Sequence, residues 1–403
     1  MPHSASISKI AQPQFRKLAE QLDKLGASGN RDGAISTTEV DSAIAAAQSD
    51  PARFGEIAAL RSLRTFVVHC GEPENGNANP LGGGGYNPVA MRSATLTGTD
   101  QSAKAPVLLG EPRIEDSCTQ VFQVPQSQRD LADRQSALVP LEAKELHLIE
   151  LKYQDTRPLR DLEFNYRNKG EFNWQTTRGD DWFDLKKREK AGEIDVKRER
   201  DHNAPWINNP IRVHVDVLFP DGRVHSVGKK FLDFHVHDAH SPDSSGYPET
   251  DNISNGYERL PRGKLPEGCL LRLTPMHENR KPWEQDRSVA ANLSWVKPIY
   301  KPDFVEQARV HEAASWEKPK ADGYEVDPTR TIAAVLVTWT DHGGISSGSV
   351  SMQGDQGSWR SPRYNIGSGE TELIPVDRKA SDGRIRIEGR GMELKRVEVL
   401  YAD

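Results

Sequence analysis

Hydrophobic positions in the first 70 residues follow the spacing of helices. Phe15, Leu18, Leu22 and Leu25 recur at steps of three and four residues, which places them on one helix face. The sequence TTE (37–39) is typical of a second helix start, and Asp50-Pro51 of an N-cap followed by proline. The third predicted helix has an apolar stripe of Phe54, Ile57, Leu60, Leu63 and Phe66. We therefore expect three short helices around a small shared core.

After residue 105 the pattern changes to short apolar or alternating runs, separated by Gly, Pro, Asn and Asp. No regular helical pattern lies between these runs, so they favour antiparallel β-sandwiches over a parallel α/β sheet. The predicted strands are HLIELKY (147–153), IRVHVDVLF (211–219), KKFLDFHVH (229–237), CLLRLTP (269–275), TIAAVLVTW (331–339), GRIRIEG (383–389) and KRVEVLY (395–401).

Part of the strand-rich region looks repeated. Trp174 and Arg178 follow one apolar strand, and Trp359 and Arg363 follow another. The Trp-x-x-x-Arg spacing is the same in both copies. This indicates two related sandwich units, although any two sandwich domains share a strand-turn-strand rhythm. Between the helices and the strands, GEPENGNANPLGGGGYNP is too rich in glycine and proline for a helix or a central strand.

Together these patterns predict a mainly β, multidomain protein. A small helical EF-hand-like N-terminal domain precedes two antiparallel, jelly-roll-like β-sandwiches. The predicted segments are the helical domain (1–70), a Gly/Pro-rich linker (71–106), the first sandwich (107–240), an irregular strand-rich connector (241–302) and the second sandwich (303–403).

Charge and composition narrow the classes of partner. The net charge of the 403-residue chain is −6, and its most basic stretch, KKREKAGEIDVKRER (186–200), mixes both signs, so we expect no nucleic-acid partner and a solvated strand or loop there. No apolar run reaches the roughly 18 residues that a membrane span needs. The start of the chain lacks a signal-peptide core, which predicts a cytoplasmic protein or one exported without a classical signal peptide.

The stretch SGNRDGAISTTE (28–39) lies between two predicted helices. Calcium prefers oxygen ligands at alternating loop positions, a glycine at the sharp turn and a closing glutamate. The stretch resembles the EF-hand family over about residues 14–47. The resemblance implies calcium ligands at Ser28, Asn30, Asp32, Ala34 (through its carbonyl), Ser36 and Glu39.

The match departs from the family pattern at two points. Serine replaces aspartate at the first position, so only Asp32 and Glu39 carry charge. No second loop is visible, so Ile35 lacks its usual partner in the sequence. Fewer charged ligands imply weak calcium binding or a loop that has lost it. The alternative is a helical hairpin with a polar turn.

Histidines cluster in FHVHDAHSPD (234–243). On a strand, His235 and His237 would share one face, and His240 follows the strand end. Zinc binds such imidazoles. The stretch resembles the HxHxDH motif of metallo-β-lactamases, but Asp238 comes one position early. A zinc site is one hypothesis, and polar residues on an exposed strand are the other. Similarly, DDWFD (180–184) could supply paired carboxylates for hydrolysis or form a solvated loop.

An exposed tryptophan beside an arginine can stack on a sugar ring and donate hydrogen bonds to it. Trp174, Arg178, Trp359 and Arg363 are therefore candidate ligand-binding residues, unless the two tryptophans fill sandwich cores. The last 20 or so residues also resemble jelly-roll carbohydrate-binding or galactose-binding-like modules. That resemblance implies a β-sandwich that binds glycans, often with a structural calcium.

These observations favour a non-catalytic protein that recognises a cell-surface glycan or a protein partner under the influence of calcium. Two alternatives remain open. The first is a metal-dependent hydrolase that uses the histidine cluster or the acidic cluster. The second is a structural or assembly component of a secreted or phage-like particle.

Overall fold

The computed structural model describes most of the helices and strands of the chain. The described residues are 3–10, 13–25, 33–70, 72–73, 106–116, 118–198, 205–231, 243, 249–254, 260–277, 279–284, 289–301, 314–316, 322–341, 346–355, 357–361, 364–366, 371–390 and 392–402. Within them the protein is mainly β with several sheets, which confirms that part of the predicted fold class.

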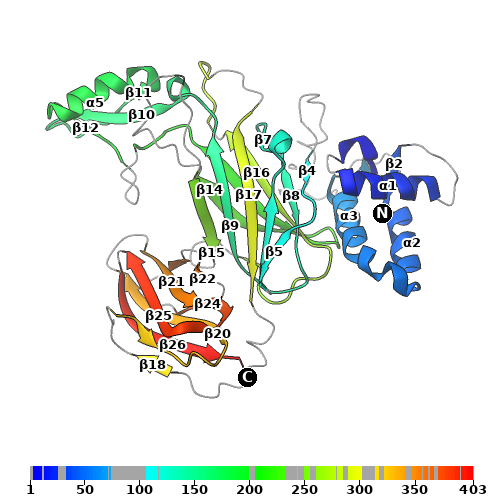
Figure 1. The fold of residues 1–403 in the computed structure, drawn as a ribbon. Coiled ribbons are helices and arrows are strands. Elements are labelled where there is room, and N and C mark those ends of the chain that lie inside the picture. Colours follow the sequence, from blue (N-terminus) through cyan, green and yellow to red (C-terminus); the bar gives the residue numbers. More distant parts are fainter. Residues whose placement is uncertain are drawn as a thin grey trace, which may run out of the picture.

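Three helices pack together near the N-terminus (Figure 1). They are α1 (Pro13–Leu25), α2 (Thr37–Gln48) and α3 (Ile57–Cys70), with a 3-10 helix (Pro51–Glu56) before α3. Asp50 caps that 3-10 helix by accepting from the Ala52 amide at 3.0 Å. We call these helices and their short strands the helical module.

Three short strands complete the helical module: β1 (His3–Ser6), β2 (Ala34–Ser36) and β3 (Glu72–Pro73). They form an antiparallel sheet in the order β2-β1-β3. In this sheet Ile35 lies opposite Ala5, and both side chains are buried. Ile35 therefore pairs with the N-terminal strand and not with the second loop that is usual in the EF-hand pattern.

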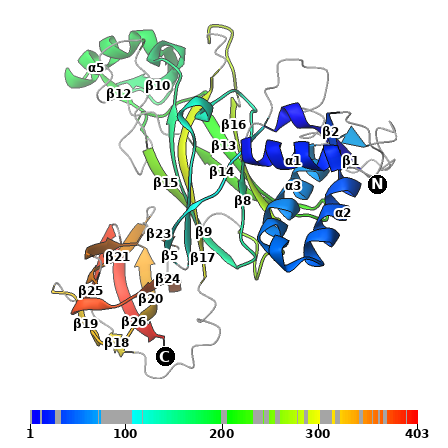
Figure 2. The same cartoon turned by 45° about the vertical axis from the view of Figure 1, so that its right-hand side comes forward.

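The first sandwich has two sheets that enclose one large core (Figure 2). One sheet has the order β14-β13-β16-β8-β4, and the other has the order β15-β9-β17-β6-β5 with β7 beside β17. All pairs are antiparallel except β4 with β8. The strands are β4 (Val107–Leu108), β5 (Arg113–Asp116), β6 (Thr119–Gln123), β7 (Asp130–Leu131), β8 (Ala137–Pro140), β9 (Leu146–Asp155), β13 (Ile211–Leu218), β14 (Val224–Phe231), β15 (Glu249–Ser254), β16 (Leu270–His277) and β17 (Ala291–Tyr300).

This pairing corrects the predicted connector at 241–302. Strands β15, β16 and β17 lie in that segment, and each pairs with a strand of the first sandwich. The side chains of Leu271, Leu273 and Val296 enter its core. The strands of this segment take their hydrogen bonds from partners that are distant in the sequence, so local spacing does not reveal their place in the sheets.

The second sandwich follows near the C-terminus. One sheet has the order β18-β26-β20-β24, and the other has the order β19-β25-β21-β22 with β23 beside β21. Its strands are β18 (Ala314–Trp316), β19 (Tyr324–Glu325), β20 (Ile332–Asp341), β21 (Ser346–Gly354), β22 (Gly357–Arg360), β23 (Tyr364–Ile366), β24 (Thr371–Arg378), β25 (Ala380–Arg390) and β26 (Met392–Tyr401).

The helical module and the second sandwich pack on opposite outer faces of the first sandwich. Leu218 and Leu270, from the five-stranded sheet, join the core of the helical module. Leu148 and Ile299, from the other sheet, join the core of the second sandwich. His147 Nε2 also lies 3.2 Å from Glu372 Oε1 across the second contact. The first sandwich is thus buried on two sides.

A small unit is inserted between β9 and β13, and it projects away from the sandwich (Figure 1). It contains a sheet of order β11-β10-β12, covered on one face by α5. We call it the inserted unit. Its elements are β10 (Glu163–Asn168), β11 (Gln175–Arg178), α5 (Trp182–Lys190) and β12 (Ile194–Val196), with 3-10 helices at Leu159–Asp161 and Gly179–Asp181. Phe164, Trp182 and Leu185 are buried in its core.

A buried arginine holds the base of the inserted unit. The Arg157 guanidinium donates to both carboxylate oxygens of Asp155 and to the Asn209 carbonyl, and its Nη1 lies 3.6 Å from Glu284 Oε1. Asn209 Nδ2 donates to the same Glu284 oxygen. Burial raises the pKa of Glu284, and it lowers the pKa of the adjacent His277 to about 4. Asp155, Asn209 and Glu284, which come from three segments far apart in the chain, thus meet at the Arg157 guanidinium.

We expect Arg157→Ala to lower the free energy of unfolding by about 3–5 kcal/mol, because it leaves buried carboxylates without their cation. Urea unfolding followed by tryptophan fluorescence measures the change. Arg53→Ala, which removes the exposed Arg53–Glu56 pair, is the control and should cost less than about 1 kcal/mol. Equal losses in the two variants would contradict the role given to Arg157.

Candidate functional site

One face of the inserted sheet is open, because α5 covers only the other. Side chains alternate along β10, so Phe164 packs under α5 whereas Asn165 and Arg167 point to the opposite face. The register places Thr176 of β11 beside Asn165, and Asp195 of β12 beside Arg167. These residues define a polar surface that we call the open face.

Aromatic side chains lie at the end of the open face where β10 leads into β11. Trp174 is 40% exposed, and the Arg167 guanidinium lies 4.9 Å from its ring centroid. Phe172, two residues earlier, is 91% exposed. Exposed aromatic side chains that project from a folded unit are typical contact residues. We call Phe172 and Trp174 the aromatic tip.

Two further tryptophans lie beside cations of the same face. The Lys197 ammonium is 4.9 Å from the Trp206 ring centroid, and the Arg178 guanidinium is 5.5 Å from that of Trp283. A cation over an aromatic ring is attracted by the negative face of the π system. Trp206, Trp283 and Arg167 were not predicted from the sequence, since they lie far from Trp174 in the chain or outside the repeated spacing.

The centre of the open face is a hydrogen-bonded polar cluster. Asn165 and Asn208 exchange side-chain hydrogen bonds of 2.7 and 3.0 Å, and the Asn208 amide also donates to Thr176 Oγ1 at 3.0 Å. Hydrogen bonds from Lys169 and Arg167 hold the pKa of Asp195 below its usual value. The face therefore offers flat rings, amides and one carboxylate that stays ionised near neutral pH.

The second predicted tryptophan has a different setting. Trp359 lies in β22 and packs against the core of the second sandwich, with the Arg378 guanidinium 5.9 Å from its ring centroid. Arg363 lies outside the described residues. Trp174, by contrast, belongs to the inserted unit, so the two tryptophans do not occupy equivalent strands of two sandwiches.

Half of the predicted calcium ligands can be placed. Ser28, Asn30 and Asp32 lie outside the described residues. Ser36 is the N-cap of α2, where its Oγ accepts from the Glu39 amide at 3.1 Å. The Glu39 carboxylate accepts from the Ser36 amide at 2.8 Å, which completes a capping box. These contacts show Glu39 holding the helix start, and calcium binding stays a prediction.

The predicted zinc ligands His235, His237, Asp238 and His240 all lie outside the described residues, as does the end of the strand predicted for 229–237. Within the described part of the chain, no group of three His, Cys, Asp or Glu side chains is placed to hold a metal ion. Zinc binding therefore stays a prediction.

The acidic cluster DDWFD is not a solvated loop. Asp180 and Asp181 belong to a 3-10 helix, and α5 begins at Trp182. Asp181 accepts from Thr177 Oγ1 at 2.5 Å, and Asp180 lies 3.3 Å from Arg178 Nη2. The sequence interpretation overlooked the helical spacing of Trp182 and Leu185, both of which are buried in the structure. The same helix and β12 replace the solvated strand or loop expected for 186–200.

Comparisons with known proteins add no family. No family model matches the chain, and no curated protein matches it. Similar solved structures include the STIV MCP (9% identity, TM-score 0.17, 70% of this chain and 95% of that one) and the PBSX exported protein XepA (9%, 0.18, 75% and 96%). Another is from Sulfolobus Turreted Icosahedral Virus (10%, 0.17, 71% and 90%). Likeness at these TM-scores carries no argument about function.

No helix in the described residues is both long and apolar enough to cross a membrane.

We expect Ser36→Ala to lower the free energy of unfolding by about 1 kcal/mol, because it removes the capping side chain of α2. Thermal unfolding in a calcium chelator measures this loss, with the exposed Ser49→Ala as control. Added calcium should raise the melting temperature of the wild type if residues 28–39 bind it, and Glu39→Gln should reduce that rise. A loss in Ser36→Ala no larger than in the control would contradict the capping role.

Proposed function

We propose that the protein is a non-catalytic structural component that associates with further protein subunits through the aromatic tip. The observation that carries this proposal is the 91% exposure of Phe172 beside the half-exposed Trp174. The described residues contain four exposed large hydrophobic side chains, of which Phe172 is the most exposed. Phe172 and Trp174 lie two positions apart, and the others are Phe54 and Ile114.

The attachment of the tip supports an assembly role. Burial of a large apolar side chain contributes about 1.5–3 kcal/mol of stabilisation. An exposed side chain gains this free energy only when a partner surface covers it. The inserted unit has its own buried core, and the Arg157 network fixes its base. A contact residue held in this way loses little conformational entropy on binding, which favours affinity. The simplest partner to test is a second copy of the chain.

The test is sedimentation velocity over a range of protein concentrations. We expect the wild type to associate as concentration rises, and the double variant Phe172→Ser/Trp174→Ser to weaken association at least tenfold, as for a pair of contact residues at an interface. Phe54→Ser is the matched control, since Phe54 is 54% exposed on the helical module. A wild type that stays monomeric throughout would contradict association between copies.

Calcium-modulated glycan recognition is a second candidate, and the open face is the observation that favours it. The Trp174 ring has the flat apolar surface on which a sugar stacks, and the amides of Asn165 and Asn208 lie nearby. Arg178 lies on the same face, beside Trp283. Sugar hydroxyls need such donors and acceptors next to an aromatic ring.

For this candidate we expect hits on a glycan array that Trp174→Ala reduces at least tenfold, because that variant removes the stacking surface. Arrays run with calcium and with a chelator show whether the ion modulates binding. Phe172→Ala should leave glycan binding unchanged, although it should weaken association between subunits. No hits in either condition would exclude the glycan candidate and leave the assembly proposal untouched.

A further inference from the structure

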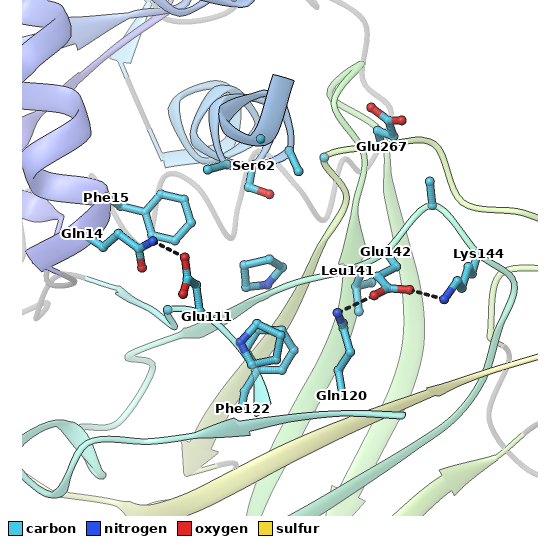
Figure 3. A pocket seen from close by; sticks show the side chains of 18 of the residues that line it. Gln14, Phe15, Ser62, Glu111, Gln120, Phe122, Leu141, Glu142, Lys144 and Glu267 are labelled. Atoms are coloured by element: carbon cyan, nitrogen blue, oxygen red, sulfur yellow. Dashed lines mark hydrogen bonds and ion pairs between the residues drawn. The ribbon is translucent and has the colours of Figure 1, made fainter. Parts of the chain in front are cut away.

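A cavity of about 520 Å³ lies where the helical module meets the first sandwich (Figure 3). Helices α1 and α3 form one wall, and the loops and strands of the sandwich form the other. A cavity of this size lies within the range of small-molecule sites. It is remote from the open face and the aromatic tip, which belong to the inserted unit.

The floor of the cavity is apolar. Phe15, Phe122 and Leu141 line it. All three side chains are largely buried, with exposed fractions of 6%, 2% and 6%. Pro112 and Pro140 also line it. Rings and branched side chains in this arrangement accept an apolar body of similar width.

One buried polar group is directed into the cavity. Ser62, Thr65 and His69 follow one another along α3 at helical spacing, and all three are buried. Thr65 Oγ1 donates to the Arg61 carbonyl at 3.2 Å, and His69 Nε2 lies 2.9 Å from the Phe219 carbonyl oxygen.

Ser62 differs from these two neighbours. Its side chain is 4% exposed, and its hydroxyl points into the cavity (Figure 3). The hydrogen bonds found among the described residues include none from that hydroxyl, which is therefore available to a molecule in the cavity. A ligand that offers a hydrogen-bond partner to this hydroxyl would gain about twofold to tenfold in affinity from that bond.

The charges around the cavity balance. Glu142 accepts from Gln120 Nε2 at 2.6 Å and lies 2.6 Å from Lys144 Nζ, while Glu111 accepts from Gln14 Nε2 at 2.7 Å. Glu267 is paired with Arg61, and Lys264 also lines the cavity. Three carboxylates and two lysines thus line the cavity, and Arg61 beside it pairs with one of the carboxylates. A charged ligand would lose its hydration in the cavity. The charged side chains there already have opposite charges nearby and would not compensate that loss, so the lining favours an uncharged ligand.

We infer that this cavity binds a small uncharged amphipathic molecule. An aromatic or alicyclic body packs on Phe15, Phe122 and Leu141, and a hydroxyl or carbonyl group of the molecule forms a hydrogen bond with Ser62. Because both modules form its walls, an occupied cavity also strengthens the contact between the helical module and the first sandwich.

The tight contact beside the cavity supports this coupling. Gly268, with a φ of +89°, lines the cavity, and a Cβ atom there would lie 2.8 Å from Arg61 Cβ on α3. The loop therefore touches the helix directly next to the opening, so a ligand would fill space between two surfaces that are already in contact.

The probe for the test is 4-(4-fluorophenyl)butan-1-ol, with the corresponding carboxylate and amine as charged analogues. Binding to the full chain is followed by ¹⁹F line broadening of each probe. We expect the neutral alcohol to bind at least several times more tightly than either analogue. Ser62→Ala removes the hydroxyl without adding bulk, and should weaken binding of the alcohol about twofold to tenfold. Ser62→Phe fills the cavity and should abolish it.

Phe172→Ala is the control for binding at the aromatic tip and should leave the affinity for the alcohol unchanged. Circular dichroism establishes that each variant is folded. No broadening of the alcohol with the wild type would overturn the inference, and so would equal binding by folded Ser62→Phe or tighter binding of a charged analogue. A loss of binding in Phe172→Ala would also overturn it, since the probe would then occupy the tip.

Discussion

The arrangement of this protein depends on one buried charge, that of Arg157. A guanidinium removed from water is stable only where carboxylates and carbonyls replace its hydration. Asp155 is the last residue of β9, Asn209 precedes β13, and Glu284 lies between β16 and β17. These groups come together only when the first sandwich is complete, so the charge couples the inserted unit to the folded sandwich. The direction in which the aromatic tip projects follows from that coupling.

The first sandwich lies at the centre of the molecule, because it contacts the helical module, the second sandwich and the inserted unit. The helical module covers part of its five-stranded sheet through Leu218 and Leu270, and the second sandwich contacts the opposite sheet through Leu148 and Ile299. Such shared cores pack neighbouring modules against one another, so the modules are not independent domains joined by a flexible linker. The inserted unit extends from this body (Figure 1). Its exposed aromatic side chains are therefore presented on a rigid support.

The two proposed sites differ in physical character. The aromatic tip is a convex surface where apolar rings meet water, which suits contact with another large surface. The cavity is concave and neutral, and its hydroxyl at Ser62 faces inward, which suits a small molecule. One site lies on the inserted unit and the other lies between two modules. A mutation in one site therefore changes no contact of the other site.

The sequence by itself determined the three N-terminal helices and several of the longer strands. Periodicity placed α1 through Phe15 and Leu22, and alternation placed strands such as β9 and β13, because spacing records which side of a segment is apolar. Tertiary structure alone decided which distant segments pair. It gave Ile35 its partner in β1, brought β15 to β17 into the first sandwich, and left Trp174 on an open face. Local spacing cannot report these outcomes, since hydrogen bonds and burial between segments depend on where the rest of the chain folds.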